Sequence, residues 1–184
     1  MARLLAPLAA ALRMASAASP ASAALQVGAR APDFTLPAAV AGKSFSFSLA
    51  GSLAKGPVVV YFFPAAFTTG CSIEAHEFAE AMPKFESLGA AVIGVSTDDI
   101  EKLARFSVEV CQNRFPVGSD AGRPVVKAYD AQLAIRPDYA DRISYLVAPD
   151  GVVIASYASP SPDKHVETML AALRAWRQAQ PARK

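Results

Sequence analysis

The feature that most constrains the fold of this sequence is the uninterrupted apolar run PVVVYFF at residues 57–63. Its β-branched and aromatic residues favour a strand, and the lack of charged positions predicts a strand in the centre of a sheet. A second run of this kind, AAVIGVST, occupies residues 90–97. A helical pattern separates the two runs, so buried strands and helices alternate through the middle of the chain.

The flanking segments predict the rest of the sheet. Short extended pieces are expected at residues 28–36 and 43–49, and the second alternates phenylalanine with serine. A Pro-Asp-Gly turn predicts a β-hairpin over 142–157. The remaining elements are expected as helices over 70–88, 99–113, 122–131 and 165–178, with a short strand at 115–120. This order predicts an α/β protein of thioredoxin-like fold, with a central mixed β-sheet flanked by helices and an N-terminal β-hairpin.

Individual positions refine the expected helices. In helix 70–88 the apolar spacing predicts a core-facing side, and Pro83 predicts a kink or a break. The expected core positions of this helix are Ile73, Phe78, Met82, Phe85 and Leu88. Asp98 and Asp99 are expected to cap the helix over 99–113.

The N-terminal 31 residues contain no acidic residue, since the first is Asp33. A basic start, a short apolar stretch and an A-x-A motif at 21–23 resemble a secretory signal. We therefore expect residues 1–23 to direct export to a bacterial periplasm, and residues 24–184 to form the folded domain. An organelle transit peptide, or an unprocessed N-terminus on a cytoplasmic protein, also fits this composition.

Charge and hydropathy argue against two classes of partner. Arg3 and Arg13 are two of the 18 basic residues, which leaves 16 basic residues against 16 acidic ones beyond position 23. A balanced domain lacks the positive charge that nucleic acid or an anionic membrane attracts. No uncharged apolar run approaches the length of a membrane span. We expect neither a nucleic-acid nor a membrane partner.

One of the two cysteines, Cys71, follows the first buried strand in the stretch FPAAFTTGC. It lies where a strand passes into a helix, and the free N–H groups of a helix N-terminus favour a thiolate over a thiol. Pro64 shapes the loop because its φ is fixed, and Thr68 can direct a hydroxyl toward the sulfur. The position alone also allows an ordinary buried cysteine at a helix start.

The spacing P-x-x-x-T-x-x-C, formed by Pro64, Thr68 and Cys71, resembles the active-site signature of the peroxiredoxins (the AhpC/TSA superfamily). Glu74, three residues after the cysteine, also fits that family. Three further segments resemble it: GVSTDD at 94–99, FPVGSDAGRPVVKAYDA at 115–131 and RISYLVAPDG at 142–151. The similarity extends over nearly the whole chain after residue 28, and it is strongest to the bacterioferritin-comigratory, or Q, subclass.

The resemblance implies a thiol-dependent peroxidase that reduces hydrogen peroxide and organic hydroperoxides without a cofactor or a metal. Cys71 would be the peroxidatic nucleophile, which becomes a sulfenic acid. Thr68 would hydrogen-bond the peroxide, and Pro64 would shield the site. Arg142 would stabilise the thiolate and the leaving oxygen, with Glu74 in support. A thioredoxin- or glutaredoxin-like protein would supply the electrons.

The second cysteine, Cys111, falls in the helix expected over 99–113, 40 residues after Cys71. Some members of the subclass carry their resolving cysteine in this helix. Others carry it five positions after the first cysteine, where this chain has His76. The resemblance therefore makes Cys111 the expected resolving cysteine, which would form an intramolecular disulfide with Cys71. The alternative is a buried cysteine in an enzyme that works with one cysteine.

Neither histidine is expected to act in the site. His76 lies about a turn and a half along the helix from Cys71, which directs it away from the sulfur. His165, at the start of the last expected helix, is interpreted as a surface residue.

Three other functions occur on the same fold, and one of them, a non-catalytic redox-sensing module, fits the same residues. A thiol-disulfide oxidoreductase needs C-x-x-C, but Thr68 occupies the position of the partner cysteine. A copper-handling module needs C-x-x-x-C and a later histidine, but position 75 is alanine, which leaves few soft ligands. The chain also lacks a GGLG segment and a C-terminal tail with a resolving cysteine, which favours a monomer or a small homodimer.

Overall fold

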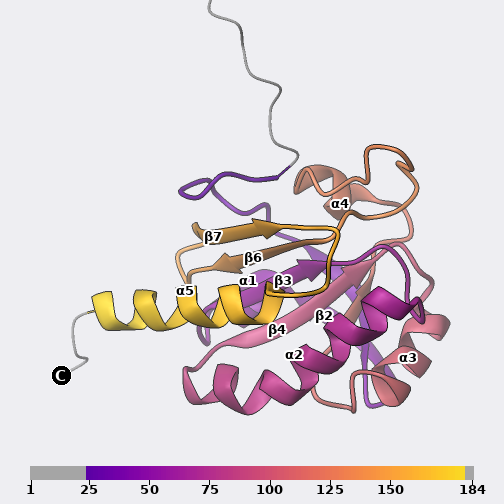
Figure 1. Cartoon of the computed structure of the whole chain (residues 1–184), viewed down its shortest axis with the longest axis horizontal. Helices are drawn as coiled ribbons and strands as arrows, with labels where there is room; N and C mark the ends of the chain where they lie inside the picture. Colours follow the sequence, from indigo (N-terminus) through magenta and orange to yellow (C-terminus); the bar gives the residue numbers. More distant parts are fainter. Residues whose placement is uncertain (1–23, 181–184) are drawn as a thin grey trace, which may run out of the picture.

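A seven-stranded mixed sheet in the order β2-β1-β5-β4-β3-β6-β7 forms the centre of the computed structural model, which describes residues 24–180 (Figure 1). The strands are β1 Thr35–Val40, β2 Lys43–Ser48, β3 Val58–Phe62, β4 Ala91–Ser96, β5 Val117–Ser119, β6 Ile143–Val147 and β7 Val153–Ala158. The helices are α1 Leu49–Leu53, α2 Thr69–Ser87, α3 Ile100–Glu109, α4 Pro124–Ala128 and α5 His165–Ala179. The signal segment expected at 1–23 lies outside the described residues.

The strand predicted from PVVVYFF is central, as expected. Strand β3 pairs in parallel with β4 and antiparallel with β6, and all five of its residues are buried. A strand that is covered on both faces requires apolar side chains at every position, which explains the unbroken run in the sequence. The prediction of a mixed sheet in a thioredoxin-like fold is confirmed.

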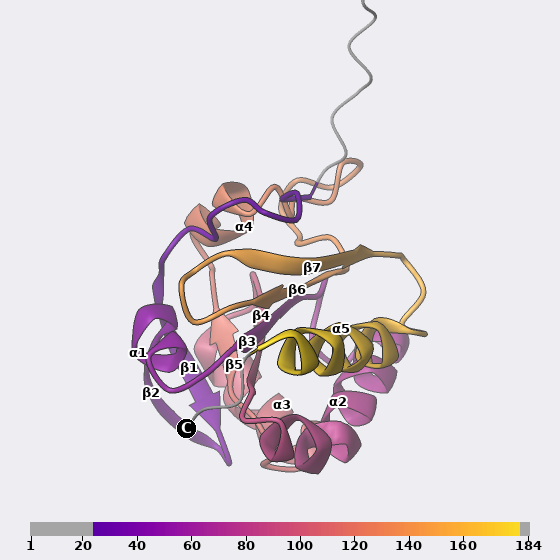
Figure 2. The same cartoon turned by 90° about the vertical axis from the view of Figure 1, so that its left-hand side faces the viewer.

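Two apolar layers cover the two faces of the sheet. Helices α2, α3 and α5 lie on one face, and α1 and α4 lie on the other (Figure 2). Alternate residues of β3 divide between them: Tyr61 joins the layer under α2, and Phe62 joins the layer under α4. Because burial of one large apolar side chain contributes roughly 1.5–3 kcal/mol, both layers hold β3 in place at the point where it leads into the site.

The N-terminal hairpin is confirmed, but its first strand begins later than predicted. Strand β1 starts at Thr35 rather than near Gly28, and residues 28–34 run outside the sheet with one isolated bridge, from Arg30 to Val152. The turn contains Ala41 and Gly42 with φ of 50° and 74°. Two successive positive φ values suit the right-handed twist of a tight hairpin, and this shortens the loop that the sequence predicted.

Helix α2 differs from its prediction in two respects. Pro83 was expected to cause a kink or a break, and the break does not occur, because the helix continues to Ser87 with the side chains of Met82 and Phe85 buried in the core. Ile73 was expected in the core but is 44% exposed, and Leu88 is only partly buried. The apolar spacing was correct from Phe78 onward and wrong in the first turns.

Helix α3 is shorter than predicted, and one helix was missed. Asp99 caps α3 as expected, because its Oδ1 accepts the Lys102 N–H at 2.7 Å, but the helix ends at Glu109. Cys111 therefore lies beyond the helix rather than in it. The five-residue helix α1 was not predicted, although Ser48 caps it by accepting the Gly51 N–H. Within residues 24–180 no helix has the length and apolarity that a membrane span requires.

Candidate active site

Cys71 lies in the first turn of α2, directly after the loop that leaves the central strand β3. Only 1% of the residue is exposed. The N-cap residue Thr68 makes no side-chain bond to the helix, so it leaves the N–H groups of the first turn without an acceptor from the cap. These N–H groups and the positive end of the helix dipole favour a negatively charged sulfur at this place.

Arg142 brings a positive charge to Cys71 from the start of β6. It precedes β6, is 6% exposed, and directs Nη2 to within 3.4 Å of the Cys71 sulfur. Its Nη1 forms an ion pair with Glu74 of α2, and its Nε donates to the Pro160 carbonyl at 3.1 Å. Three contacts in the plane of the guanidinium fix its orientation, so a positive charge faces the sulfur permanently.

The guanidinium passes close over the backbone of α2. A Cβ added at Gly70 would lie 3.1 Å from Arg142 Nη2, which is tighter than ordinary contact. Glycine at this position therefore allows Arg142 to approach the start of the helix. The sequence analysis gave Gly70 no role, and only the neighbouring arginine shows why the residue is small.

Behind Arg142 lies a buried polar cluster that contains His165. His165 was interpreted as a surface residue, but the structure contradicts this: it is 0% exposed at the start of α5. Its Nδ1 lies 2.8 Å from Ser144 Oγ and 3.5 Å from Glu74 Oε1, and its Nε2 lies 3.2 Å from the Ser159 carbonyl. Burial raises the pKa of Glu74 to about 8, against the lowering effect of Arg142, and burial lowers the pKa of His165 to about 4.

The loop between β3 and α2 holds the other residues of the predicted signature. Pro64 is half-buried at the strand exit, and Thr68 is exposed, with its hydroxyl donating to the Ala65 carbonyl at 2.9 Å. The hydroxyl hydrogen of Thr68 is therefore engaged, and its oxygen keeps the capacity to accept. Phe67 adopts a φ of 68°, a conformation that costs a non-glycine residue about 1–3 kcal/mol.

Asp98 holds this loop in place, a role that the sequence analysis missed. It was expected only as a helix cap, but its Oδ2 accepts the Ala66 N–H at 2.7 Å and the Ser96 hydroxyl at 2.9 Å. Its Oδ1 accepts from Lys102 at 2.6 Å. The carboxylate thus ties the loop before Cys71 to the end of β4 and the first turn of α3. The signals in the sequence were the position of Asp98 at a strand end and the resemblance of the segment 94–99 to the family.

Cys111 is also buried, with 0% exposure, but no charged group is bonded to its sulfur. Burial alone raises its pKa above the ordinary range of a thiol. The next two residues, Gln112 and Asn113, have φ of 52° and 60°. Gln112 Nε2 lies 2.9 Å from His76 Nδ1, so the segment after Cys111 is attached to α2. His76 lies on the surface of α2, as expected.

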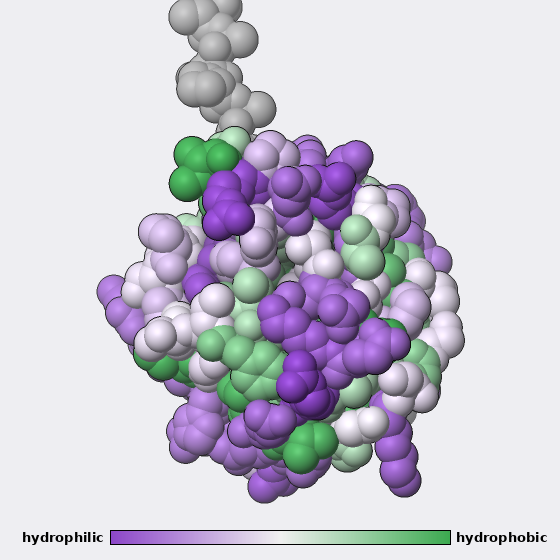
Figure 3. Space-filling model, turned by 90° about the vertical axis from the view of Figure 1, so that its right-hand side faces the viewer, coloured by the Kyte–Doolittle hydropathy of each residue, from purple (hydrophilic) through white to green (hydrophobic). Residues whose placement is uncertain are grey.

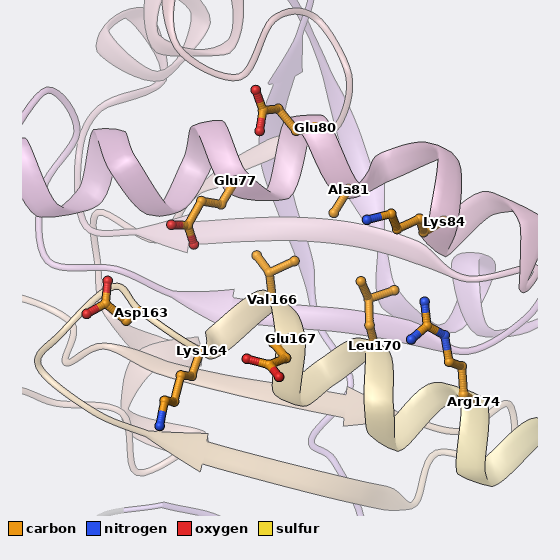
Figure 4. A pocket seen from close by; sticks show the side chains of 10 residues that line it. All are labelled: Glu77, Glu80, Ala81, Lys84, Asp163, Lys164, Val166, Glu167, Leu170 and Arg174. Atoms are coloured by element: carbon orange, nitrogen blue, oxygen red, sulfur yellow. The ribbon is translucent and has the colours of Figure 1, made fainter.

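The surface around the start of α2 is mixed. Phe67, Ile73 and Val108 are exposed, and Figure 3, which faces this end of the molecule, shows apolar residues among polar ones. A groove of about 550 Å³ lies elsewhere, between α2 and α5, where Glu77 of α2 faces Val166 of α5 (Figure 4). None of the signature residues lines this groove. In residues 24–180 no group of three or more metal-ligating side chains comes together.

Comparisons with known proteins show which family this chain resembles. The model of the AhpC/TSA family matches residues 27–156. The chloroplastic peroxiredoxin Q of Oryza sativa subsp. japonica is 34% identical over 148 residues, 80% of this chain and 66% of the relative.

Two solved structures are similar over most of the fold. Peroxidoxin BcpB from Mycobacterium tuberculosis has a TM-score of 0.74 and 32% identity, covering 82% of this chain and 97% of that one. The bacterioferritin comigratory protein of Xanthomonas campestris, described for its alkyl peroxide reduction activity, has a TM-score of 0.68 and 27% identity. That similarity covers 77% of this chain and 92% of that one.

Proposed function

The chain belongs to the AhpC/TSA family and is a peroxiredoxin, a thiol peroxidase, and we propose that it reduces hydrogen peroxide and organic hydroperoxides through Cys71. The Cys71 thiolate attacks one peroxide oxygen and the O–O bond breaks. That oxygen remains on sulfur as a sulfenic acid, and the other leaves as water or an alcohol after it takes a proton.

The observation that carries the proposal is the contact between Arg142 and Cys71. A fixed guanidinium 3.4 Å from the sulfur stabilises the thiolate before the reaction. The same charge stabilises the oxygen that becomes negative as the O–O bond breaks, and such preorganised donors typically contribute 10²- to 10³-fold in rate. The hydrogen bond that Nη1 donates to Glu74 Oε2 prevents Arg142 from turning away from the sulfur.

Thr68 and Pro64 support the same step in different ways. Because the Thr68 hydroxyl donates to Ala65, it can accept a hydrogen bond from the O–H of a bound peroxide. Pro64 has no N–H and a fixed φ, so it holds the loop over the sulfur without competing for the peroxide. Asp98 keeps this loop against the body of the protein through the Ala66 N–H.

We propose a preference for small peroxides. Cys71 is only 1% exposed, so a bulky substrate has little access to the sulfur in this conformation. The exposed side chains of Phe67 and Ile73 offer apolar contacts to the alkyl group of a hydroperoxide. The alkyl peroxide reduction named for the Xanthomonas relative supports organic hydroperoxides as a second substrate class.

We further propose that Cys111 resolves the sulfenic acid. The Cys111 thiolate attacks the Cys71 sulfur, the hydroxyl leaves as water, and an intramolecular disulfide forms. Both sulfurs are buried and the Cys111 pKa is raised, so the first turns of α2 and the segment after α3 must open before the sulfurs meet. The bond between His76 and Gln112 would couple the two openings, because unwinding α2 as far as His76 releases both segments.

An external dithiol protein of the thioredoxin or glutaredoxin kind would then reduce the disulfide. This assignment, a monomer or small homodimer, and export to a bacterial periplasm are proposals that rest on the family and on the sequence. Size-exclusion chromatography with light scattering tests the oligomeric state, and fractionation of an expressing cell with N-terminal sequencing tests the export.

Peroxide consumption by three forms of the protein, each with defined thiol donors, tests the proposed function. We expect wild type to consume hydrogen peroxide and a small alkyl hydroperoxide. Cys71→Ser should lose this activity entirely. Cys111→Ser should keep the first turnover and lose part of the steady-state rate, to a degree that depends on the donor. Full activity in Cys71→Ser would overturn the assignment of the nucleophile.

A further inference from the structure

His165 occupies a constrained place at the start of α5. The chain enters this helix through Lys164, whose φ of 68° costs about 1–3 kcal/mol for a non-glycine residue. The imidazole is completely buried and packs edge-on against Tyr157, with ring centroids 4.7 Å apart. A polar ring held at this depth has to satisfy both of its nitrogens from its neighbours.

The neighbours determine where the ring carries its hydrogen. A carbonyl oxygen only accepts, so the contact with Ser159 at 3.2 Å requires a hydrogen on Nε2. In a neutral imidazole Nδ1 is then an acceptor, and it takes the Ser144 hydroxyl at 2.8 Å. The same nitrogen lies 3.5 Å from Glu74 Oε1, and a neutral His165 has no hydrogen on Nδ1 to donate to that oxygen.

The second oxygen of Glu74 lacks a donor among the described residues. Oε2 accepts from Arg142, but Oε1 is buried without a hydrogen-bond partner. A buried carboxylate oxygen without a donor, beside a nitrogen that also lacks a hydrogen, is costly, and one proton on Glu74 Oε1 or on His165 Nδ1 removes that cost. We propose that Glu74 and His165 share one proton in the folded protein. His165 thereby acts as a positioning residue: the pair is uncharged, so it does not neutralise Arg142, whose positive charge acts on Cys71.

The charge balance explains the effect on the sulfur. With one shared proton the pair is neutral, whether the proton is on Glu74 or on His165. Without it, the Glu74 carboxylate neutralises Arg142 and adds a negative charge that disfavours the Cys71 thiolate. Burial raises the pKa of Glu74 to about 8 and lowers that of His165 to about 4, so the pair holds one proton across neutral pH. The other ionisable groups beside the pair are Arg142, Cys71, Glu77, Tyr61 and Tyr157.

The inference rests on Cys71 as the reactive thiol, but its test does not require peroxide. The rate at which iodoacetamide alkylates Cys71 is measured against pH by mass spectrometry of its peptide, and the midpoint reports thiolate formation. In His165→Asn the side-chain amide can donate a hydrogen bond to an ionised Glu74, which the neutral imidazole cannot do. Hydrogen bonds to charged groups are stronger than those between neutral groups, so the substitution favours the ionised form of Glu74. Glu74 then ionises at neutral pH, and the Cys71 midpoint should rise by about one pH unit.

Two further variants make the result decisive. Glu74→Gln has the charge of a protonated Glu74, so its midpoint should equal that of wild type, and adding His165→Asn to it should cause no further shift. Glu80→Gln, which removes an exposed carboxyl group from α2, should leave the midpoint unchanged. The proposal is overturned if His165→Asn keeps the wild-type midpoint, if its shift persists with Glu74→Gln, or if Glu74→Gln alone lowers the midpoint. Circular dichroism melts of each variant verify the fold, and peroxide turnover separately tests the proposed function.

Discussion

The surroundings of Cys71 and of Cys111 differ, although the two cysteines are equally buried. Cys71 lies at the start of a helix with a guanidinium 3.4 Å from its sulfur, and a carboxylate and an imidazole lie behind that guanidinium. Cys111 lies just beyond the end of a helix among apolar side chains, where burial raises its pKa. Burial alone therefore does not decide reactivity: the polar groups around one sulfur allow a charge that the core around the other does not.

The largest expected effect comes from replacing the fixed guanidinium beside Cys71 with a cation that lacks its geometry. Arg142→Lys should slow the oxidation of Cys71 by about 100- to 1,000-fold, because a lysine cannot contact Cys71, Glu74 and Pro160 at once. Stopped-flow oxidation with hydrogen peroxide measures this rate. Arg174→Lys, on the exposed side of α5, is the matched control. An unchanged rate in Arg142→Lys would show that the fixed guanidinium geometry beside Cys71 is not what activates it.

The polar groups around Cys71 should also make the free energy of unfolding depend on pH. The pKa of Glu74 is raised from 4.5 to about 8, so its stabilising contribution is complete below pH 4.5 and is lost as the pH rises through 8. Relative to Glu74→Gln, the free energy of unfolding of wild type in urea should therefore fall by about 5 kcal/mol as the pH rises through this range. Glu80→Gln, exposed on the same helix, should behave like wild type. An equal fall in Glu74→Gln would contradict the assignment.

The apolar surroundings of Cys111 should tolerate a polar substitution poorly. Cys111→Ser places a hydroxyl where no polar partner is bonded to the sulfur, and we expect it to lower the free energy of unfolding by about 2 kcal/mol. Cys71→Ser should cost less, because Arg142 can donate to the new hydroxyl. Urea unfolding of both variants at one pH makes the comparison. Equal costs would mean that the two surroundings do not differ in polarity.

The smallest expected effect tests the fit of Arg142 over the helix. Gly70→Ala places a Cβ 3.1 Å from Nη2, so the guanidinium has to move by a few tenths of an ångström. We expect Cys71 oxidation to slow by about threefold, since a displacement near 1 Å costs about 100-fold. Gly51→Ala in α1, where the added Cβ has ordinary contacts, is the control. Oxidation as fast as in wild type would show that Arg142 has room to adjust.

Local sequence patterns predicted most of the sheet but fewer of the contacts in the site. The run at 57–63 predicted the central strand, a Pro-Asp-Gly turn predicted the later hairpin, and two short extended pieces predicted the N-terminal one. Each pattern reflects the structure of one short segment. The ends of β1 and α3, and the unbroken passage through Pro83, depend on packing against distant elements. The same limit applies to His165, whose burial depends on partners about 20 and 90 residues away along the chain.

The contact between Arg142 and Cys71 could be anticipated only from a family resemblance. The two residues are separated by 71 positions, and no local pattern brings them together. Local patterns do not show the roles of Asp98 and Gly70 for the same reason. The role of Asp98 depends on the Ala66 N–H, and that of Gly70 depends on the Arg142 guanidinium. Sequence patterns thus indicate which residues can react, whereas tertiary contacts determine which of them are activated.

Time-resolved trapping of oxidised cysteines tests the central claim most directly. Reduced wild-type protein receives one equivalent of hydrogen peroxide, samples are quenched with dimedone and an alkylating reagent, and both cysteine peptides are quantified by mass spectrometry. We predict that sulfenic acid appears first on Cys71, at a rate proportional to peroxide. A disulfide between Cys71 and Cys111 should follow at a rate independent of peroxide and faster in sub-denaturing urea. Oxidation of Cys111 while Cys71 is still reduced, or lasting sulfenic acid on Cys71 with Cys111 free, would contradict the account.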